Sequence, residues 1–400
     1  MAYTTTTSGT SSTLVGTDGA DKTSSSSKSL VVNSFEGADD FTFTGSAKGT
    51  IGMGGDKDTV TASGAADSLN ITLGDAADTF KYSGAFNTKG ITVGGQGGAD
   101  TFTLNEDASA RANYYGGGQG ADTFTGTIQL QTSIVGGSEN DKVGASGTGV
   151  EVGALTFING QVGADKIYVD LIDANSTNTT VRGGSEADTI VLTNTAGTAS
   201  ADLFGDKGAD TITGAGGVDN IDGGGGADRI DAGVGGGKVK LGDGNDTVIA
   251  SNAAATAAAK VSDFVKADDM IGFSVGSMTL QNGNDADVAA GADVVSQSID
   301  GSAYIGVTTN VIKYTGTAVA DVTNLTSALN AYTVLAAGAL ADSGDTAAFI
   351  VEYTDTSGDQ KYAYSLATVG SNAAVTFSNT KDLVNVGDAE ATTANLSFVA

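Results

Sequence analysis

The sequence predicts an all-β fold, in which a long parallel β-solenoid is followed by a smaller β-rich domain with one helix. Three observations lead to this fold class. A short phrase rich in glycine and aspartate recurs about every 20 residues, a large apolar residue follows each aspartate at a fixed distance, and the 400 residues include 60 glycines but no proline. Such a period is too short for a strand-helix-strand crossover, so each repeat must be a small coil stacked on its neighbours.

The recurring phrase consists of glycines, Ala-Asp, Thr or a similar residue, and a large apolar residue. It reads GGQGADTF at Gly117–Phe124 and GGGGADRI at Gly223–Ile230. Asp219 adds a copy nine residues before the next aspartate, and Asp21 is a weaker copy. Looser copies place the aspartate at intervals of 18 to 24 residues, at Asp39, Asp58, Asp78, Asp100, Asp122, Asp141, Asp165, Asp188, Asp210, Asp228 and Asp246.

An apolar residue stands two positions after each of these eleven aspartates. These residues are Phe41, Val60, Phe80, Phe102, Phe124, Val143, Ile167, Ile190, Ile212, Ile230 and Val248. A second alternating pattern precedes the glycines, as at Ile71 and Leu73. Alternation together with β-branched and aromatic residues indicates strands. Each repeat is therefore a strand, a glycine-aspartate turn, a second strand and a variable return, and we assign the solenoid to residues 14–250.

The turn chemistry predicts a bound cation. Coils stacked about 4.8 Å apart would bring the aspartates into a column of mutually repelling carboxylates. The chain has only 16 Lys and 3 Arg, too few and too scattered to neutralise that column. Calcium accepts about six to eight oxygen ligands, including the backbone carbonyls that glycine turns can point inward. We therefore expect Ca²⁺ as the cofactor, with the eleven aspartates and Asp219 as its ligands.

The pattern resembles the repeats-in-toxin (hemolysin-type) nonapeptide, G-G-x-G-x-D-x-U-x, and this resemblance implies a calcium-binding parallel β-roll. It covers roughly residues 14 to 273, and Val261–Phe273 resembles the closing stretch that follows such repeats. The family's spacing of nine occurs only around Asp210, Asp219 and Asp228, so we expect one main calcium column. Other copies depart from the pattern at Asp56, Leu73, Glu139, Glu186 and Leu241.

The remaining segments divide the chain further. Residues 1–13 form a Ser/Thr-rich tract that we expect to be a tail, and residues 251–272 form the closing segment. We assign residues 273–400 to a β-rich C-terminal domain. There, apolar residues at helical spacing from Val319 to Leu335 predict one helix, and alternation around Phe349 and Tyr362 predicts a β-hairpin.

Composition limits the functions to be considered. The chain has neither Cys nor His, which removes most nucleophiles, general bases and zinc ligands, so we expect no enzyme activity. A net charge of −28 with only three arginines argues against nucleic acid as a partner. No apolar run is long enough to cross a membrane.

The resemblance also implies a location and a role. The family is exported by type I systems that read an uncleaved C-terminal signal, and the chain ends in NLSFVA after a start without a signal peptide. The composition is similar to that of surface-layer proteins exported in this way. We expect a secreted structural protein, a calcium-stabilised rod that self-assembles head-to-tail into a cell-surface layer or filament. The alternative is a secreted calcium-dependent adhesin or carbohydrate-binding module, with a cell-surface polysaccharide as partner.

Overall fold

The computed structural model describes residues 3–8, 10–44, 47–82, 88–107, 110–172, 178–193, 197–250, 258–274, 292, 296–299, 311–315, 318–330, 346–369, 375–387 and 391–399. The chain divides into two compact units, Met1–Thr211 and Ile212–Ala400. Strands dominate both units, and the predicted all-β solenoid fold is confirmed.

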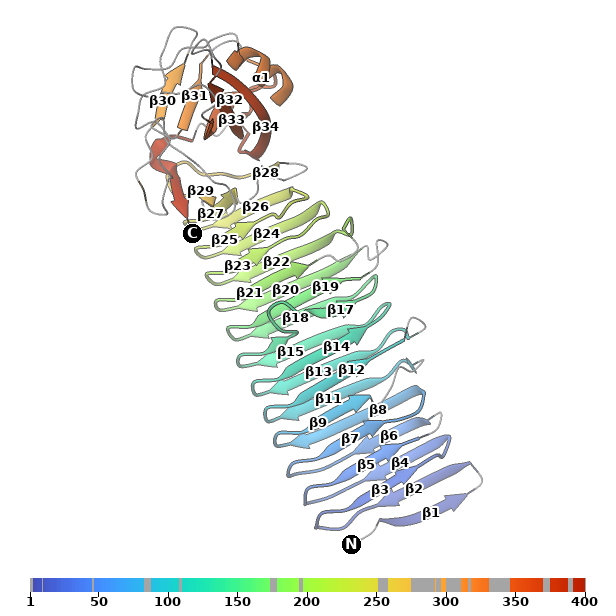
Figure 1. Cartoon of the computed structure of the whole chain (residues 1–400). Coiled ribbons are helices and arrows are strands. Elements are labelled where there is room, and N and C mark those ends of the chain that lie inside the picture. Colours follow the sequence, from blue (N-terminus) through green and yellow to red (C-terminus); the bar gives the residue numbers. More distant parts are fainter. Residues whose placement is uncertain are drawn as a thin grey trace. The chain divides into compact units, whose positions relative to one another are not determined.

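Unit 1 consists of stacked coils whose strands form two sheets, A and B (Figure 1). The strands of sheet A in this unit are β1 (Thr4–Ser8), β2 (Ser11–Val15), β4 (Ser29–Asn33), β6 (Ala47–Gly52), β8 (Ala66–Asp75), β10 (Thr88–Lys89), β11 (Thr92–Gly97), β13 (Tyr114–Gln119), β15 (Ser133–Ser138), β18 (Phe157–Val162), β20 (Thr179–Ser185) and β22 (Ala201–Lys207). The strands of sheet B are β3 (Lys22–Ser25), β5 (Asp40–Phe43), β7 (Thr59–Ala62), β9 (Thr79–Tyr82), β12 (Thr101–Asn105), β14 (Thr123–Ile128), β16 (Lys142–Val143), β17 (Val150–Val152), β19 (Lys166–Leu171) and β21 (Thr189–Thr193).

Equivalent residues of successive coils lie opposite one another and form the core. Phe41 pairs with Val60, and Val60 pairs with Phe80 on the next coil. Further along, the rings of Phe102 and Phe124 stack with centroids 4.5 Å apart. Side chains alternate across a strand, so the apolar residue two positions after each aspartate points inward. All eleven of these residues are at most 1% exposed, as the sequence predicts.

The turns between the sheets are tight enough to require glycine at particular positions. Gly118 and Gly120 both have φ of +112°, a conformation that other residues rarely adopt. A Cβ atom on Gly118 would lie only 2.4 Å from the carbonyl oxygen of Gln96 on the preceding coil. Stacking the coils at strand spacing therefore depends on these glycines.

The N-terminal tract differs from the expected tail. Residues 1–13 include β1 and part of β2, and β1 pairs antiparallel with β2, which pairs parallel with β4. Tyr3 is buried, and its ring meets that of Phe41 edge-on at 6.4 Å. All five side chains of β1 are exposed, so its polar sequence gives no sign of the backbone pairing that holds it. Strand β1 thus covers one edge of β2.

Unit 2 contains further coils and the strands that cover them. Its coil strands are β24 (Asp219–Gly225), β26 (Gly237–Asp243) and β28 (Ala259–Val261) in sheet A, and β25 (Arg229–Asp231), β27 (Thr247–Ala250) and β29 (Met270–Ser274) in sheet B. The boundary between the units falls within β23 (Thr211–Thr213). The chain's last strand, β35 (Leu396–Val399), pairs parallel with β29, and β28 pairs with β34 (Val375–Asn385).

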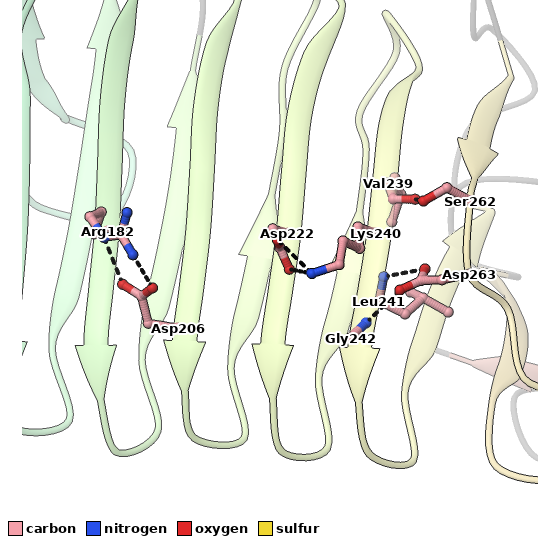
Figure 2. Close-up of polar contacts among 9 residues, drawn as sticks. All are labelled: Arg182, Asp206, Asp222, Val239, Lys240, Leu241, Gly242, Ser262 and Asp263. Atoms are coloured by element: carbon pink, nitrogen blue, oxygen red, sulfur yellow. Dashed lines mark hydrogen bonds and ion pairs between the residues drawn. The ribbon is translucent and has the colours of Figure 1, made fainter.

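The closing segment caps an incomplete strand pair. Strand β28 is shorter than β26, so it does not reach the backbone N–H groups of Leu241 and Gly242. The carboxylate of Asp263 accepts hydrogen bonds from both groups, at 2.8 and 3.1 Å (Figure 2). Ser262 extends the pairing by donating through its backbone N–H and its hydroxyl to the carbonyl of Val239. The side chain of Asp263 thus takes the place of the next strand.

The rest of unit 2 is a sheet with one helix. It contains β30 (Ser296–Ile299), β31 (Val311–Tyr314), β32 (Thr346–Thr354), β33 (Gln360–Val369) and β34, with α1 (Val322–Asn330) and the short 3₁₀ turn η1 (Thr393–Asn395). Strands β32 and β33 pair antiparallel with Phe349 and Tyr362 buried, which confirms the predicted hairpin. Helix α1 buries Leu325 and Leu329, as its spacing predicts. Leu335 lies outside the described residues.

Candidate functional site

Buried aspartates end the turns that lead into sheet B. Asp122, for example, directly precedes β14, and the other ten predicted aspartates occupy the same place in their coils. We call them the aspartate column: Asp39, Asp58, Asp78, Asp100, Asp122, Asp141, Asp165, Asp188 and Asp210 in unit 1, and Asp228 and Asp246 in unit 2. Each is at most 2% exposed. Carboxylates are very rarely buried to this degree without a partner.

One oxygen of each carboxylate links it to the preceding coil. The backbone N–H of Asp100 donates to Oδ1 of Asp122 at 2.7 Å, and that of Asp122 donates to Oδ1 of Asp141 at 2.8 Å. The same hydrogen bond, of 2.7 to 2.8 Å, joins every successive pair from Asp21 to Asp210 in unit 1 and joins Asp228 to Asp246 in unit 2. The column is therefore a continuous ladder within unit 1.

The second oxygen has no such bond along much of the ladder. At nine positions the Oδ2 atom is buried and has no hydrogen-bond partner: Asp39, Asp58, Asp78, Asp100, Asp122, Asp141, Asp165, Asp188 and Asp246. Leaving a buried acceptor unsatisfied costs about 1–3 kcal/mol, and more for a charged group. These oxygens are therefore open to a cation, a proton or a water molecule.

Glycines make the space around each Oδ2 atom. A Cβ atom on Gly117 would lie 1.9 Å from Oδ2 of Asp122 and 2.6 Å from the carbonyl oxygen of Gly136 on the next coil. Gly136 stands in the same relation to Asp141, with a distance of 2.1 Å. Each of these glycines therefore leaves room for the carboxylate oxygen beside a neighbouring coil's carbonyl. This is the physical reason for glycine at the start of the repeated phrase.

Burial raises the pKa of ten of the eleven column carboxyls. The pKa reaches about 7 at Asp122 and about 8 at Asp141 and Asp188, well above the ordinary value of 3.8. Desolvation is the largest cause in each case, opposed by the hydrogen bond from the preceding aspartate's N–H, while neighbouring carboxylates raise the pKa further. A cation beside these groups would lower the pKa values and keep the carboxylates ionised.

Basic side chains pair with outward-facing acids. Arg182 on β20 binds Asp206 on β22 through two nitrogens (Figure 2). Its guanidinium also lies over the ring of Phe204, 4.7 Å from the ring centroid. Lys240 on β26 likewise binds Asp222 on β24 at 2.9 Å. These ion pairs bridge neighbouring coils on the outer face of sheet A, so they do not neutralise the column inside.

The structure adds one aspartate to the column in each unit. In unit 1, Asp21, a weak copy in the sequence, joins the start of the ladder, and its Oδ2 accepts hydrogen bonds from the backbone and hydroxyl of Thr17. Asp269 follows Asp246, and its two oxygens accept from the N–H groups of Asp246 and Val265. Sequence reasoning missed Asp269 because no glycines precede it, although Ile271 follows two residues later, as an apolar residue does after each of the eleven predicted aspartates.

Asp219 lies apart from the column. It begins β24 in sheet A, whereas the column aspartates precede strands of sheet B. It is fully buried, and its Oδ2 accepts a hydrogen bond from the N–H of Ala215 at 2.9 Å. Asp219 is thus on the opposite side of its coil from the column, where the nine-residue spacing would place a second row.

The donor chemistry of the column fits a hard cation. Carboxylate oxygens without donors lie beside backbone carbonyls, in a space from which glycine keeps side chains out. Among the residues that the structure describes, no three acidic, His or Cys side chains form a metal cluster. A bound calcium would therefore rely on backbone carbonyls and water for its remaining ligands.

Comparisons with known proteins add no family or relative. No protein-family model matches the chain, and no curated protein or solved structure is significantly similar to it. In the part of the chain that is described, no helix has the length and apolar character needed to span a bilayer.

Proposed function

We propose that this protein is a secreted, calcium-stabilised structural rod that self-assembles into a cell-surface layer or filament. The observation that carries the proposal is the ladder of buried aspartates whose second oxygen has no partner at nine positions. A ladder of this kind stiffens a long, repetitive surface and offers no catalytic group. We propose no enzyme activity for the chain.

Calcium is the cation that we assign to the column. It binds carboxylate and carbonyl oxygens in flexible geometries, whereas Mg²⁺ demands a nearly octahedral set and gives up its water reluctantly. The column residues named above would hold it, and Asp219 falls outside that set. Bound Ca²⁺ would supply positive charge between carboxylates in a chain of net charge −28.

Exposed strand edges support self-assembly. Strand β1 pairs with β2 on one side, all five of its side chains are exposed, and no pairing is described for its other edge. Such an edge is a template for pairing with another chain. A contact between this end of one subunit and the C-terminal end of another would be heterologous, so it can propagate as a filament or sheet.

Secretion by a type I route is consistent with the same chemistry. Without calcium, the repelling carboxylates would keep the coils from compacting, which suits passage through a channel before folding outside. The apolar C-terminal residues Leu396 and Phe398 are buried against β29 in the folded chain. We propose that a receptor reads this segment before folding.

The test measures assembly with and without calcium, both for the wild type and for a variant in which the edge of β1 is blocked. We expect purified protein in millimolar Ca²⁺ to form ordered arrays or filaments under negative-stain microscopy, and a chelator to disperse them. Replacing Thr5 and Thr7 on β1 with lysine should abolish assembly while circular dichroism stays native, because charged edge residues block strand addition. The matched control places lysines at Thr101 and Thr103, exposed on the interior strand β12. Normal assembly of the β1 variant, or dispersed wild type at every calcium concentration, would overturn the proposal.

A second candidate function is a secreted calcium-dependent adhesin or carbohydrate-binding module. One observation favours it, an exposed aromatic side chain beside a trough on the outer face of sheet A. This function does not exclude the first, since a surface rod can also hold a polysaccharide.

A further inference from the structure

A shallow trough of about 470 Å³ crosses the outer face of sheet A in unit 1. It spans four consecutive strands, β11, β13, β15 and β18. Gly94 and Gly116 lie opposite each other on its floor, Val135 follows them on the next strand, and Tyr114 stands beside them. Gly117 and Gly136, which contact the column aspartates from the inside, also line the trough, so the backbone of these strands separates the trough from the column.

The fold does not require glycine at these two floor positions. Neither Gly94 nor Gly116 has a positive φ, and both precede the glycines that contact the column aspartates. A Cβ atom on Gly94 would meet no atom within 4 Å. Glycine weakens a strand when nothing in the backbone needs it. The two glycines therefore keep the floor of the trough open and are not needed to form the coil.

The ring of Tyr114 lies across Gly116. A Cβ atom on Gly116 would approach Cε1 and the hydroxyl oxygen of Tyr114 to 3.1 Å, and no backbone atom is as near. Gly116 thus allows the ring to lie down along the sheet instead of standing away from it. The tyrosine nevertheless remains 41% exposed, so part of its ring is open to solvent above the trough.

The polar groups around the trough are uncharged. Gln96 and Gln161 line it from β11 and β18, and both side chains are exposed. Apart from the tyrosine hydroxyl, no ionisable side chain lines it. An anionic ligand would meet no cation here and would be repelled by a chain of charge −28. A cationic ligand would find no carboxylate within the trough.

We propose that this trough binds a neutral polysaccharide. One pyranose ring would lie on the exposed face of Tyr114, where its C–H groups meet the aromatic surface, and its neighbours would extend over the glycine floor. The amides of Gln96 and Gln161 offer both donors and acceptors to sugar hydroxyls. This inference goes beyond the proposed structural function and stands whether or not the rod assembles.

The test uses an array of neutral hexose oligomers and uronate-containing oligomers of equal length, probed with the full chain in millimolar calcium. We expect binding to at least one neutral series and none to the acidic series. Tyr114→Ala should reduce that binding at least tenfold, and Tyr114→Phe should retain most of it because the ring remains. Tyr168→Ala, on β19 of sheet B, is the matched control and should bind like the wild type.

Gly94→Val tests the floor directly. The new side chain would enter open space on a strand that favours β-branched residues, so we expect an unchanged or higher melting temperature together with lost sugar binding. Three results would overturn the proposal: no neutral oligomer binds, the acidic series binds better, or both Tyr114→Ala and Gly94→Val bind normally. A changed oligomeric state in Gly94→Val would also overturn it, since the trough would then be a contact between copies of the chain.

Discussion

The solenoid coils and the antiparallel sheet of unit 2 differ in whether their buried polar groups have hydrogen-bond partners within the protein. In the sheet, protein groups partner the buried charges: Glu352 accepts from Lys313 and Gln360, and the hydroxyl of Tyr353 donates to Asp382. One exception among the described residues of this sheet is the buried side-chain oxygen of Gln360. In the coils, one carboxylate oxygen without a partner recurs at nine positions.

The difference shows what each region needs in order to fold. Side chains of the sheet satisfy its own buried polar groups. Its stability therefore depends less on calcium and pH than the stability of the coils does. The coils repeat one charged group in one place, so no side chain of the opposite sign can reach every position. Repetition gives the coils a continuous core, but it leaves their charge to be balanced from outside the chain.

Removing calcium should have the largest effect of any change. At one hundred times its Kd, each independent site contributes about 2.7 kcal/mol of stability, so several sites exceed the stability of an ordinary domain. We expect chelator to lower amide protection strongly in the coils of unit 1 while β32–β34 keep theirs, as measured by hydrogen exchange. Equal loss in both regions, or no loss in the coils, would contradict the comparison.

When calcium is absent, lowering the pH should stabilise the coils. The folded-state pKa of Asp122 and Asp141 is about 7 and about 8, against 3.8 for an ordinary aspartate. Between these values the folded coils bind protons that the unfolded chain has released, so stability falls as pH rises from about 4 to about 8. We expect the melting temperature in chelator to fall over this range.

Calcium should reverse that slope, because protons then compete with the ion for the same oxygens. A variant carrying both Asp122→Asn and Asp141→Asn should show a flatter slope in chelator. An unchanged slope in this variant would mean that the overall negative charge of the chain, and not the column, causes the pH dependence.

A single substitution in the ladder should stabilise the coils without calcium and destabilise them with calcium. In Asp122→Asn the amide oxygen can still accept from Asp100, while the amide nitrogen can donate near the carbonyl of Gly136. We expect a gain of about 1–3 kcal/mol in chelator, because a buried charged acceptor is replaced by a satisfied group. In calcium the same variant should bind the ion more weakly and melt lower.

The control for this variant is Asp67→Asn, at an exposed position on β8. It should change neither the stability in chelator nor the stability in calcium. Calorimetric melting with and without calcium measures both effects. A loss of stability in both conditions would show that the carboxylate is satisfied within the chain.

The sequence predicts the coils better than it predicts their ends. A repeated phrase places Asp122 and Phe124 without ambiguity, because each copy meets the same neighbours above and below. The ends have only one neighbour, so their residues depart from the repeat. Asp269 lacks the preceding glycines, and β1 has no buried side chain to reveal its pairing. Asp219 has the nine-residue spacing of a second row, and the structure places it in the turn on the other side of its coil.

The cap of the last complete coil should show the smallest effect. Asp263 satisfies the N–H groups of Leu241 and Gly242, which β28 is too short to reach. Asp263→Ala leaves both donors without that partner, and because water can replace part of the bond we expect a loss of about 1–2 kcal/mol, seen as a lower melting temperature. Asp268→Ala, at an exposed neighbouring position, should leave the melting temperature unchanged.

The same substitution bears on how a solenoid ends. With its capping carboxylate removed, this edge of β26 regains free backbone donors and becomes able to pair with another chain. We therefore expect Asp263→Ala to aggregate faster than Asp268→Ala in calcium, measured by light scattering. If the two variants melt and scatter alike, the pairing of β28 with β34, and not Asp263, closes the coils, and the closing segment has no capping role of its own.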